Sequence, residues 1–221
     1  MIGSDEVALI AGGGTAPHYP SRPVGENGVV STASGRAIFL VGPSSAGKSS
    51  LGRALVELLP DPFMFFETDR CGLRGPSGRP ELETFEREEL VTRGAAFAIR
   101  GYLEAGLDLV VEVGLWHPRV RHMAAAVFEP FDAWLVGLRW DLGELERRER
   151  QRDDGIFAGT AHSQATLRDA WSLPYDLVVD AVGKSPAEAA LEIVEWLSTG
   201  PTPRAIRRVA SSNRRAGGPK A

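Results

Sequence analysis

The sequence predicts a three-layer α/β sandwich in which helices cover both faces of a five-stranded parallel sheet. Strand-like apolar runs alternate with helix-like periodic segments through most of the chain. These runs are continuously apolar, which is typical of parallel strands that are buried on both faces. The length of 221 residues, of which 43% are hydrophobic, fits one globular domain.

The expected elements follow in chain order, and each is recognised by its pattern of apolar residues. Strands are expected where compact apolar runs occur, at residues 37–42, 63–68, 107–115, 133–140 and 175–182. Helices are expected where apolar residues recur at helical spacing, at residues 48–59, 81–104, 117–128, 164–171 and 185–197. A very charged segment, DLGELERRERQRDD, spans residues 141–154.

Composition divides the chain into three parts. Residues 1–36 are rich in glycine, proline and small polar residues, and we expect a disordered leader there. Residues 37–199 form the expected domain. Residues 200–221 contain six basic and no acidic residues, and therefore carry a charge of +6. Because the net charge of the whole chain is −4, the remaining residues carry −10. We expect this basic tail to be disordered, although RNA, a membrane or an acidic partner could contact it.

The same properties exclude several classes of protein. An acidic domain would repel the phosphates of nucleic acid, so general nucleic-acid binding is not expected. The sequence contains no apolar run of the roughly 18 residues that a membrane span needs, and its start does not resemble a signal peptide. The single cysteine, Cys71, cannot form an internal disulfide, and we expect it to be a buried, inert thiol. We therefore expect a cytoplasmic protein that does not bind membranes.

The stretch GPSSAGKS begins directly after the first apolar strand and leads into a helix, which is the context of a P-loop, the Walker A motif. Its glycines allow successive amides to point at phosphate oxygens, Lys48 reaches the β and γ phosphates, and Ser49 ligates Mg²⁺. ATP and Mg²⁺ are thus the expected cofactors. The residues expected to contact the nucleotide are Gly42, Pro43, Ser44, Ser45, Ala46, Gly47, Lys48, Ser49 and Ser50.

A P-loop indicates a nucleotide but leaves the reaction open. The only asparagines are Asn27 and Asn213, so the Asn-Lys-x-Asp guanine signature of GTPases is missing. The LSGGQ signature of ABC transporter ATPases is missing as well. A small kinase is the class that remains favoured.

The second strand, in FMFFETDR, ends at Glu67, Thr68 and Asp69, at the sheet edge where the phosphate loop is expected. An acid there could orient a substrate hydroxyl and accept its proton. Spacing alone leaves a helix cap, or an ion pair with Arg70 or Arg74, equally open.

The segment GPSSAGKSSLGRALVELLPDPFMFFETDR resembles the start of the chloramphenicol 3-O-phosphotransferase family, which has a GxSSAGKS loop and a strand ending in aspartate at this spacing. Weaker similarity continues through GLDLVVEVGL, RERQR and YDLVVD, over residues 37–197. The resemblance implies ATP- and Mg²⁺-dependent phosphorylation of a hydroxyl on a small molecule. It also implies that Asp69 is the catalytic base.

Glu112, near the end of the third strand, stands where P-loop proteins hold an acid for Mg²⁺. The similar family has paired aspartates here, whereas this chain has Glu112 and Val113. A buried pair between Glu112 and an arginine is the alternative. His117 precedes Pro118 at a helix start, where it could line the substrate pocket or simply begin the helix.

The arginines of ELERRERQR suit phosphate oxygens, and such a segment often forms a lid over the nucleotide. Arg148 and Arg152 share one helical face and match the lid arginines of the similar family, RExxR. The later arginine of that family is replaced near Gly155, and its histidine before YD falls at Ala170.

The expected function is a small-molecule O-phosphotransferase in which Lys48, Asp69, Arg148 and Arg152 act in catalysis. A nucleotide or metabolite kinase of the shikimate or gluconate type would use the same residues. A regulator that hydrolyses ATP slowly and signals through its basic tail is the alternative outside the kinases.

Overall fold

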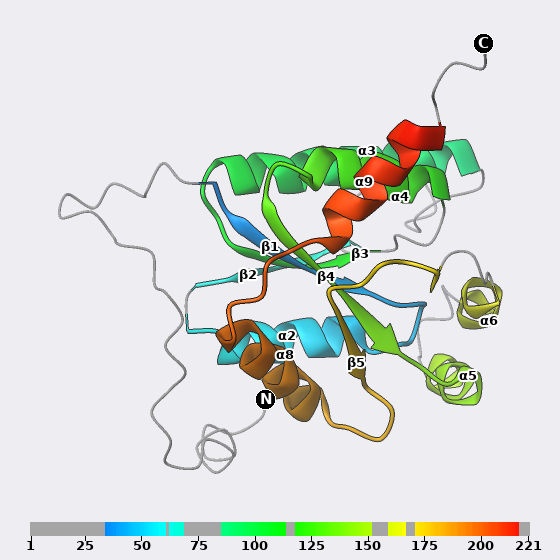
Figure 1. Cartoon of the computed structure of the whole chain (residues 1–221). Helices are drawn as coiled ribbons and strands as arrows, with labels where there is room; N and C mark the ends of the chain where they lie inside the picture. Colours follow the sequence, from blue (N-terminus) through cyan, green and yellow to red (C-terminus); the bar gives the residue numbers. More distant parts are fainter. Residues whose placement is uncertain are drawn as a thin grey trace, which may run out of the picture.

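Five parallel strands form the centre of the protein, with helices on both faces (Figure 1). The computed structural model describes residues 34–60, 62–68, 85–113, 118–151, 159–166 and 171–216. Their sheet has the order β2-β3-β1-β4-β5, and all neighbouring strands pair in parallel. The fold class predicted from the sequence is confirmed.

The elements lie close to their expected positions. The strands are β1 (Arg36–Val41), β2 (Met64–Glu67), β3 (Leu109–Val113), β4 (Asp132–Arg139) and β5 (Leu177–Asp180). The helices are α2 (Lys48–Leu58), α3 (Phe85–Glu104), α4 (Pro118–Phe128), α5 (Leu142–Arg150), α6 (Thr160–Ala165), α8 (Pro186–Ser198) and α9 (Ala205–Ala216). The short helix expected at 164–171 differs most: α6 begins and ends earlier, and residues 167–170 lie outside the described part.

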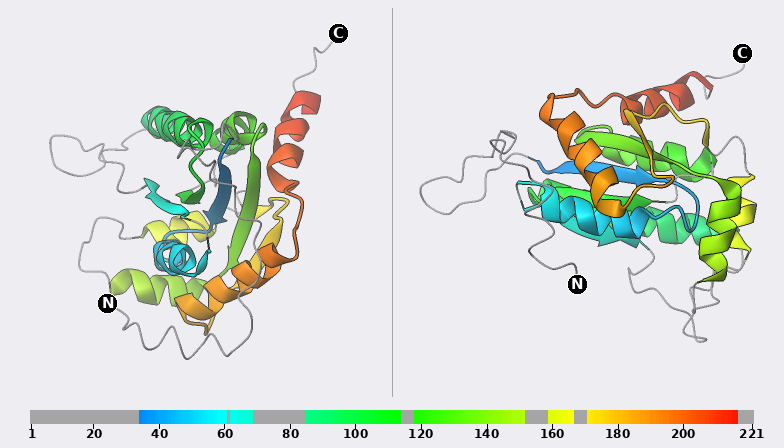
Figure 2. Two further views of the ribbon diagram at one scale, coloured as in Figure 1. Left: turned by 90° about the vertical axis from the view of Figure 1, so that its left-hand side faces the viewer. Right: turned by 90° about the horizontal axis from the view of Figure 1, so that it is seen from below.

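The two faces of the sheet are covered by different helices. Helices α2 and α8 lie on one face, and α3, α4 and α9 lie on the other (Figures 1 and 2). Along β1, Ile38 and Leu40 pack into the core on the α2 and α8 side, and the alternate residues Ala37, Phe39 and Val41 pack on the opposite side. Because both faces of the central strand are buried, its sequence is a continuous apolar run.

Helix α9 corrects the expectation of a disordered tail at residues 200–221, which is wrong for residues 205–216. Ala205, Ile206, Val209 and Ala210 are buried against the core on the α4 side of the sheet. Their spacing places them on one face of the helix, so the arginines between them point outward. The basic composition conceals this apolar stripe.

The start of α9 is fixed by Asp176, which lies just before β5. One carboxylate oxygen accepts hydrogen bonds from the backbone N–H groups of Arg204, at 2.8 Å, and Ala205, at 3.0 Å. The other oxygen accepts from the N–H of Leu135 on β4, at 2.9 Å. Asp176 thus joins the helix to the sheet and caps its N-terminus. Of the leader expected at residues 1–36, residues 1–33 lie outside the described part, and Arg36 already belongs to β1; residues 217–221 also lie outside the described part.

Two glycines allow aromatic rings to approach the backbone closely. A Cβ atom on Gly52 of α2 would lie 2.2 Å from the ring of Phe65, and one on Gly137 of β4 would lie 2.8 Å from the ring of Tyr175. Burial raises the pKa of Tyr175 to about 12, against the opposing charge of Arg121, so its phenol is neutral at physiological pH.

Among the described residues, none of the helices combines the length and the hydrophobicity that a membrane span requires.

Candidate active site

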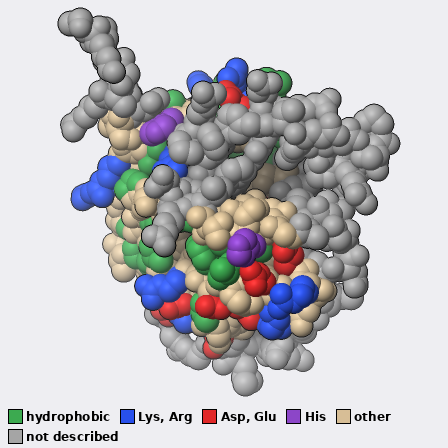
Figure 3. Space-filling model, turned by 90° about the vertical axis from the view of Figure 1, so that its right-hand side faces the viewer, with side chains coloured by type: hydrophobic (Ala, Val, Ile, Leu, Met, Phe, Trp, Pro, Cys, Tyr) green, Lys and Arg blue, Asp and Glu red, His purple; other side chains and the backbone are tan. Residues whose placement is uncertain are grey.

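The candidate site lies at the carboxyl ends of the strands. The loop between β1 and α2 lies at this edge, together with the ends of β2 and β3 and with helices α5 and α6 (Figure 1). Acidic and basic side chains gather over α5 and α6 on this side of the molecule (Figure 3). Ligands of open parallel sheets bind at this edge, because the connecting loops form a crevice there.

The loop expected to bind phosphate has an unusual backbone. Gly47 caps the start of α2 with a φ of 91°, in the left-handed region that favours glycine. Ser45 also has a positive φ, 64°, which costs roughly 1–2 kcal/mol for a residue with a side chain. Its buried hydroxyl has no hydrogen-bond partner within the described segments. The loop is therefore strained, as often occurs at ligand sites.

Lys48 begins α2 and bends back over the loop. Its Nζ donates hydrogen bonds to the carbonyl oxygens of Gly42 and Pro43, both at 2.9 Å. The carbonyl of Pro43 also accepts from the N–H of Ala46, at 3.3 Å, which closes the turn. The ammonium group is thus held above the loop, where the sequence analysis expects phosphates.

Ser49 and Glu112, the two expected metal ligands, lie together. The Ser49 hydroxyl on α2 donates a hydrogen bond of 2.6 Å to Oε2 of Glu112 on β3. The side chain of Glu112 is 2% exposed, so a carboxylate is buried directly below the phosphate loop. The two side chains come from α2 and β3, which are separated along the chain by β2 and α3.

A second carboxylate, which the sequence analysis mentioned only as part of a strand end, lies beside this pair. Glu67 ends β2 in register with Glu112 of β3, and it forms an ion pair with Arg53 of α2. Arg53 lies one helical turn after Ser49, so the two residues of α2 face the two acids. Asp69, to which the sequence analysis gave the catalytic role, lies outside the described residues, as does Arg152.

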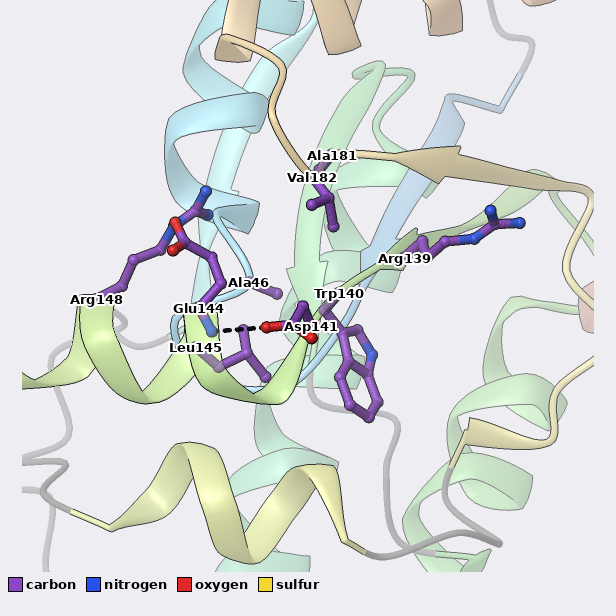
Figure 4. Close-up of a pocket in the computed structure, with 9 residues that line it drawn as sticks. All are labelled: Ala46, Arg139, Trp140, Asp141, Glu144, Leu145, Arg148, Ala181 and Val182. Carbon is purple, nitrogen blue, oxygen red and sulfur yellow. Dashed lines mark hydrogen bonds and ion pairs between the residues drawn. The ribbon is translucent and has the colours of Figure 1, made fainter.

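Helix α5 places Arg148 against the phosphate loop. A Cβ atom on Gly47 would lie 3.4 Å from Nη1 of Arg148. Glu144 accepts hydrogen bonds from both Arg147 and Arg148, at 2.7 Å each. The carboxylate of Glu144 thus lies beside the guanidinium of Arg148 and holds it (Figure 4). These bonds, the one from Arg147 first, lower the pKa of Glu144 to about 2, so the carboxylate is charged at neutral pH.

An open pocket lies between the phosphate loop and the end of β5 (Figure 4). Ala46 of the loop, Trp140 after β4 and Val182 after β5 supply apolar surface. Arg148 and Glu144 line the side formed by α5. The pocket thus continues outward from the loop along the ends of β4 and β5.

Helix α6 reaches the loop from another direction. Oε1 of Gln164 accepts a hydrogen bond of 2.7 Å from the backbone N–H of Ser44. The sequence gave no signal for this contact, because the two residues lie 120 positions apart and glutamine is common on solvated helices. Gln164 is therefore a site residue that sequence reasoning missed.

Comparisons with known proteins show the family of the chain and agree on its fold. The family model described as "Chloramphenicol phosphotransferase-like protein" matches residues 35–198. The chain belongs to this family. The family match and the kinase fold make this chain a phosphotransferase of the kinase class that acts on a hydroxyl group. The match runs from the start of β1 to the end of α8, so it includes the whole candidate site.

A curated relative from Mycobacterium tuberculosis (strain H37Rv), "Putative O-phosphotransferase Rv2636", is 29% identical over 202 residues, covering 79% of this chain and 88% of the relative.

Solved structures show the same fold. A sugar kinase from Janibacter has a TM-score of 0.58 at 18% identity, covering 76% of this chain and 96% of that one. The Mycobacterium tuberculosis APS kinase CysC, solved with AMPPNP and APS, has a TM-score of 0.54 at 20% identity and covers 75% and 98%. The shikimate kinase of Acinetobacter baumannii, solved with shikimate, has a TM-score of 0.54 at 17% identity and covers 75% and 94%.

Proposed function

We propose that this protein transfers the γ-phosphoryl group of ATP, in the presence of Mg²⁺, to a hydroxyl group of an antibiotic-like molecule or metabolite. The observation that carries the proposal is the contact between Ser49 and the buried Glu112 beneath a loop that also holds the Lys48 ammonium. A hydroxyl, a carboxylate and an ammonium arranged in this way suit a metal-bound triphosphate.

The residues present fit Mg²⁺. Magnesium prefers oxygen ligands and is usually bound by one or two carboxylates together with phosphate oxygens. Ser49 and Glu112 supply a hydroxyl and a carboxylate that already lie 2.6 Å apart, and they would hold the ion. When bound, Mg²⁺ would neutralise charge on the β and γ phosphates.

The chain itself would supply the remaining electrostatic stabilisation. Helix α2 begins at Lys48, beside the proposed position of the phosphates, and the macrodipole of the helix favours negative charge there. Lys48 lies at the loop and Arg148 lies over Gly47, so both cations would lie close to the proposed position of the phosphoryl group. Such fixed charges stabilise the charge that develops during transfer.

In the proposed transfer, the acceptor hydroxyl oxygen attacks the γ phosphorus as the bond to the β–γ bridging oxygen breaks, and ADP leaves. Asp69 accepts the proton of the hydroxyl, as the family resemblance implies, and Arg152 completes the lid with Arg148. Asp69 follows β2 closely, so it is expected at the same sheet edge as Glu67.

We also propose that the nucleotide base lies in the pocket of Figure 4. The pocket adjoins the loop at Ala46 and offers the apolar surfaces of Trp140 and Val182. A base there would place the phosphates toward Lys48. This placement leaves the edge beside β2 and β3 for the acceptor.

The two alternatives differ in their support. A kinase of the shikimate or gluconate type would use the same fold, and only the acceptor separates it from the proposal. The slow regulatory ATPase depended on a loose basic tail, whereas α9 packs onto the core through Ile206 and Val209. No observation in the structure therefore favours the regulator.

The test measures ADP release with Mg²⁺ and ATP while hydroxyl-bearing antibiotics and metabolites are added one at a time. We expect one compound to stimulate ADP release and to gain a phosphate, detected by mass spectrometry. Lys48→Ala should abolish the stimulation, whereas Arg100→Ala should preserve it, because Arg100 lies near the end of α3, at the opposite edge of the sheet. Stimulation by a protein or a nucleic acid alone would contradict the proposal.

A further inference from the structure

One peptide unit of the phosphate loop joins Lys48 to Gln164. The carbonyl oxygen of the Pro43–Ser44 peptide accepts a hydrogen bond from Nζ of Lys48, at 2.9 Å. The N–H of the same peptide donates to Oε1 of Gln164, at 2.7 Å. The described part of the chain contains no cis peptide bond, so these two groups point in opposite directions. Lys48 and Gln164 therefore hold the peptide from its two sides.

Gln164 is fixed in place because its helix, α6, is hydrogen-bonded to α5. Oε2 and Oε1 of Glu149 on α5 accept hydrogen bonds from the N–H groups of Gly159, at 3.0 Å, and Ala161, at 2.8 Å, which fixes the start of α6. Glu146 contacts Nδ1 of His162, at 2.8 Å. The carbonyl of Gln164 accepts from Nε1 of Trp171, at 2.9 Å.

The hydrogen bond from Ser44 affects Lys48 in two ways. Donation by the N–H polarises the peptide, which strengthens the carbonyl of Pro43 as an acceptor for the ammonium. The bond also fixes the orientation of the peptide, which adjoins the strained residue Ser45 with its φ of 64°. Without Gln164 the peptide could rotate to relieve this strain, and the carbonyl that holds Nζ would turn away.

We propose that Gln164 is a positioning residue for phosphoryl transfer, which orients the Lys48 ammonium through the Pro43–Ser44 peptide. The same helix pair carries Arg148, whose guanidinium lies over Gly47. The contact of α5 and α6 with the loop therefore fixes the positions of both cations, Lys48 and Arg148. This inference rests on the proposed function, because it assigns Lys48 to the phosphates of ATP.

The test is a double-mutant cycle of Gln164→Leu and Lys48→Ala. It is read out as the single-turnover rate of Mg·ATP hydrolysis and as the affinity for Mg·ATP. Gln164→Leu should reduce the rate roughly five- to tenfold, the value of one hydrogen bond, and change ATP affinity by less than about twofold. In the Lys48→Ala background the same substitution should change the rate by less than about twofold, because its effect passes through Lys48.

A matched control is Gln151→Leu, because Gln151 is the exposed C-cap of α5 and its side-chain oxygen accepts a hydrogen bond of 3.0 Å from Arg147. It should leave both the rate and the affinity unchanged. If Gln164→Leu does not fold, Gln164→Asn takes its place, since the shorter side chain cannot reach Ser44. Equal losses of rate in both backgrounds, or a lower melting temperature with an unchanged rate per folded molecule, would overturn the inference. A wild-type protein that neither binds nor turns over Mg·ATP would instead refute the proposed function.

Discussion

The packing of α9 provides a direct test of the fold, because the basic composition of this segment suggested disorder. Ile206 is 3% exposed and lies in the core on the α4 side of the sheet. Replacing a buried isoleucine by alanine typically costs about 2–4 kcal/mol, from lost burial and from the cavity that remains. For a protein of this size each kcal/mol lowers the melting temperature by about 2–4 °C. Ile206→Ala should therefore lower it by about 5–15 °C.

The assay is thermal unfolding followed by circular dichroism, with Arg208→Ala as the control because Arg208 is exposed on the same helix. The control should move the melting temperature by about 2 °C or less. Affinity for Mg·ATP at 20 °C should stay unchanged in both variants, since α9 lies on a face of the sheet away from the loop. An Ile206→Ala variant as stable as the wild type would show that α9 does not pack in solution, and the reasoning would fail.

Four further predictions concern the site. Glu112→Gln should raise the Mg²⁺ concentration needed for half-maximal activity by roughly tenfold or more, because a neutral amide is a weaker ligand than a carboxylate; a magnesium titration measures this. Asp69→Asn should reduce acceptor phosphorylation by about a hundredfold with little change in ATP affinity, and unchanged turnover would remove Asp69 as the base. Gly52→Ala should destabilise the protein by about 1–3 kcal/mol in urea unfolding, because the new Cβ would lie 2.2 Å from the ring of Phe65. The Glu144 carboxylate should titrate in carbon NMR with a pKa of about 2, lowered from the usual 4.5. Because the folded-state pKa is lowered, the stabilisation by Arg147 and Arg148 is fully present above pH 4.5 and is lost as the pH falls through about 2.

The sequence alone was sufficient to predict the class of fold, and it also indicates a phosphate-binding loop, which stays a prediction. Strands β1, β3 and β4 are buried on both faces along most of their length, so apolar residues dominate each of them, and this property is visible in a single chain. The spacing of Gly42, Gly47, Lys48 and Ser49 reflects local backbone geometry, so it suggests phosphate binding without knowledge of distant partners. Glu112 was suggested as a metal ligand because it lies near the end of a parallel strand, and in the structure it accepts a hydrogen bond from Ser49.

Tertiary structure decided the features whose partners are remote in sequence. Gln164 meets Ser44 across 120 positions, and Asp176 meets Arg204 across 28. Helix α9 exists because Ile206 and Val209 find apolar surface on the core, which no local pattern of charges reveals. Local motifs arise from backbone geometry within a few residues and can be read from one chain. Contacts between distant segments depend on how the layers pack, and only the folded structure specifies them.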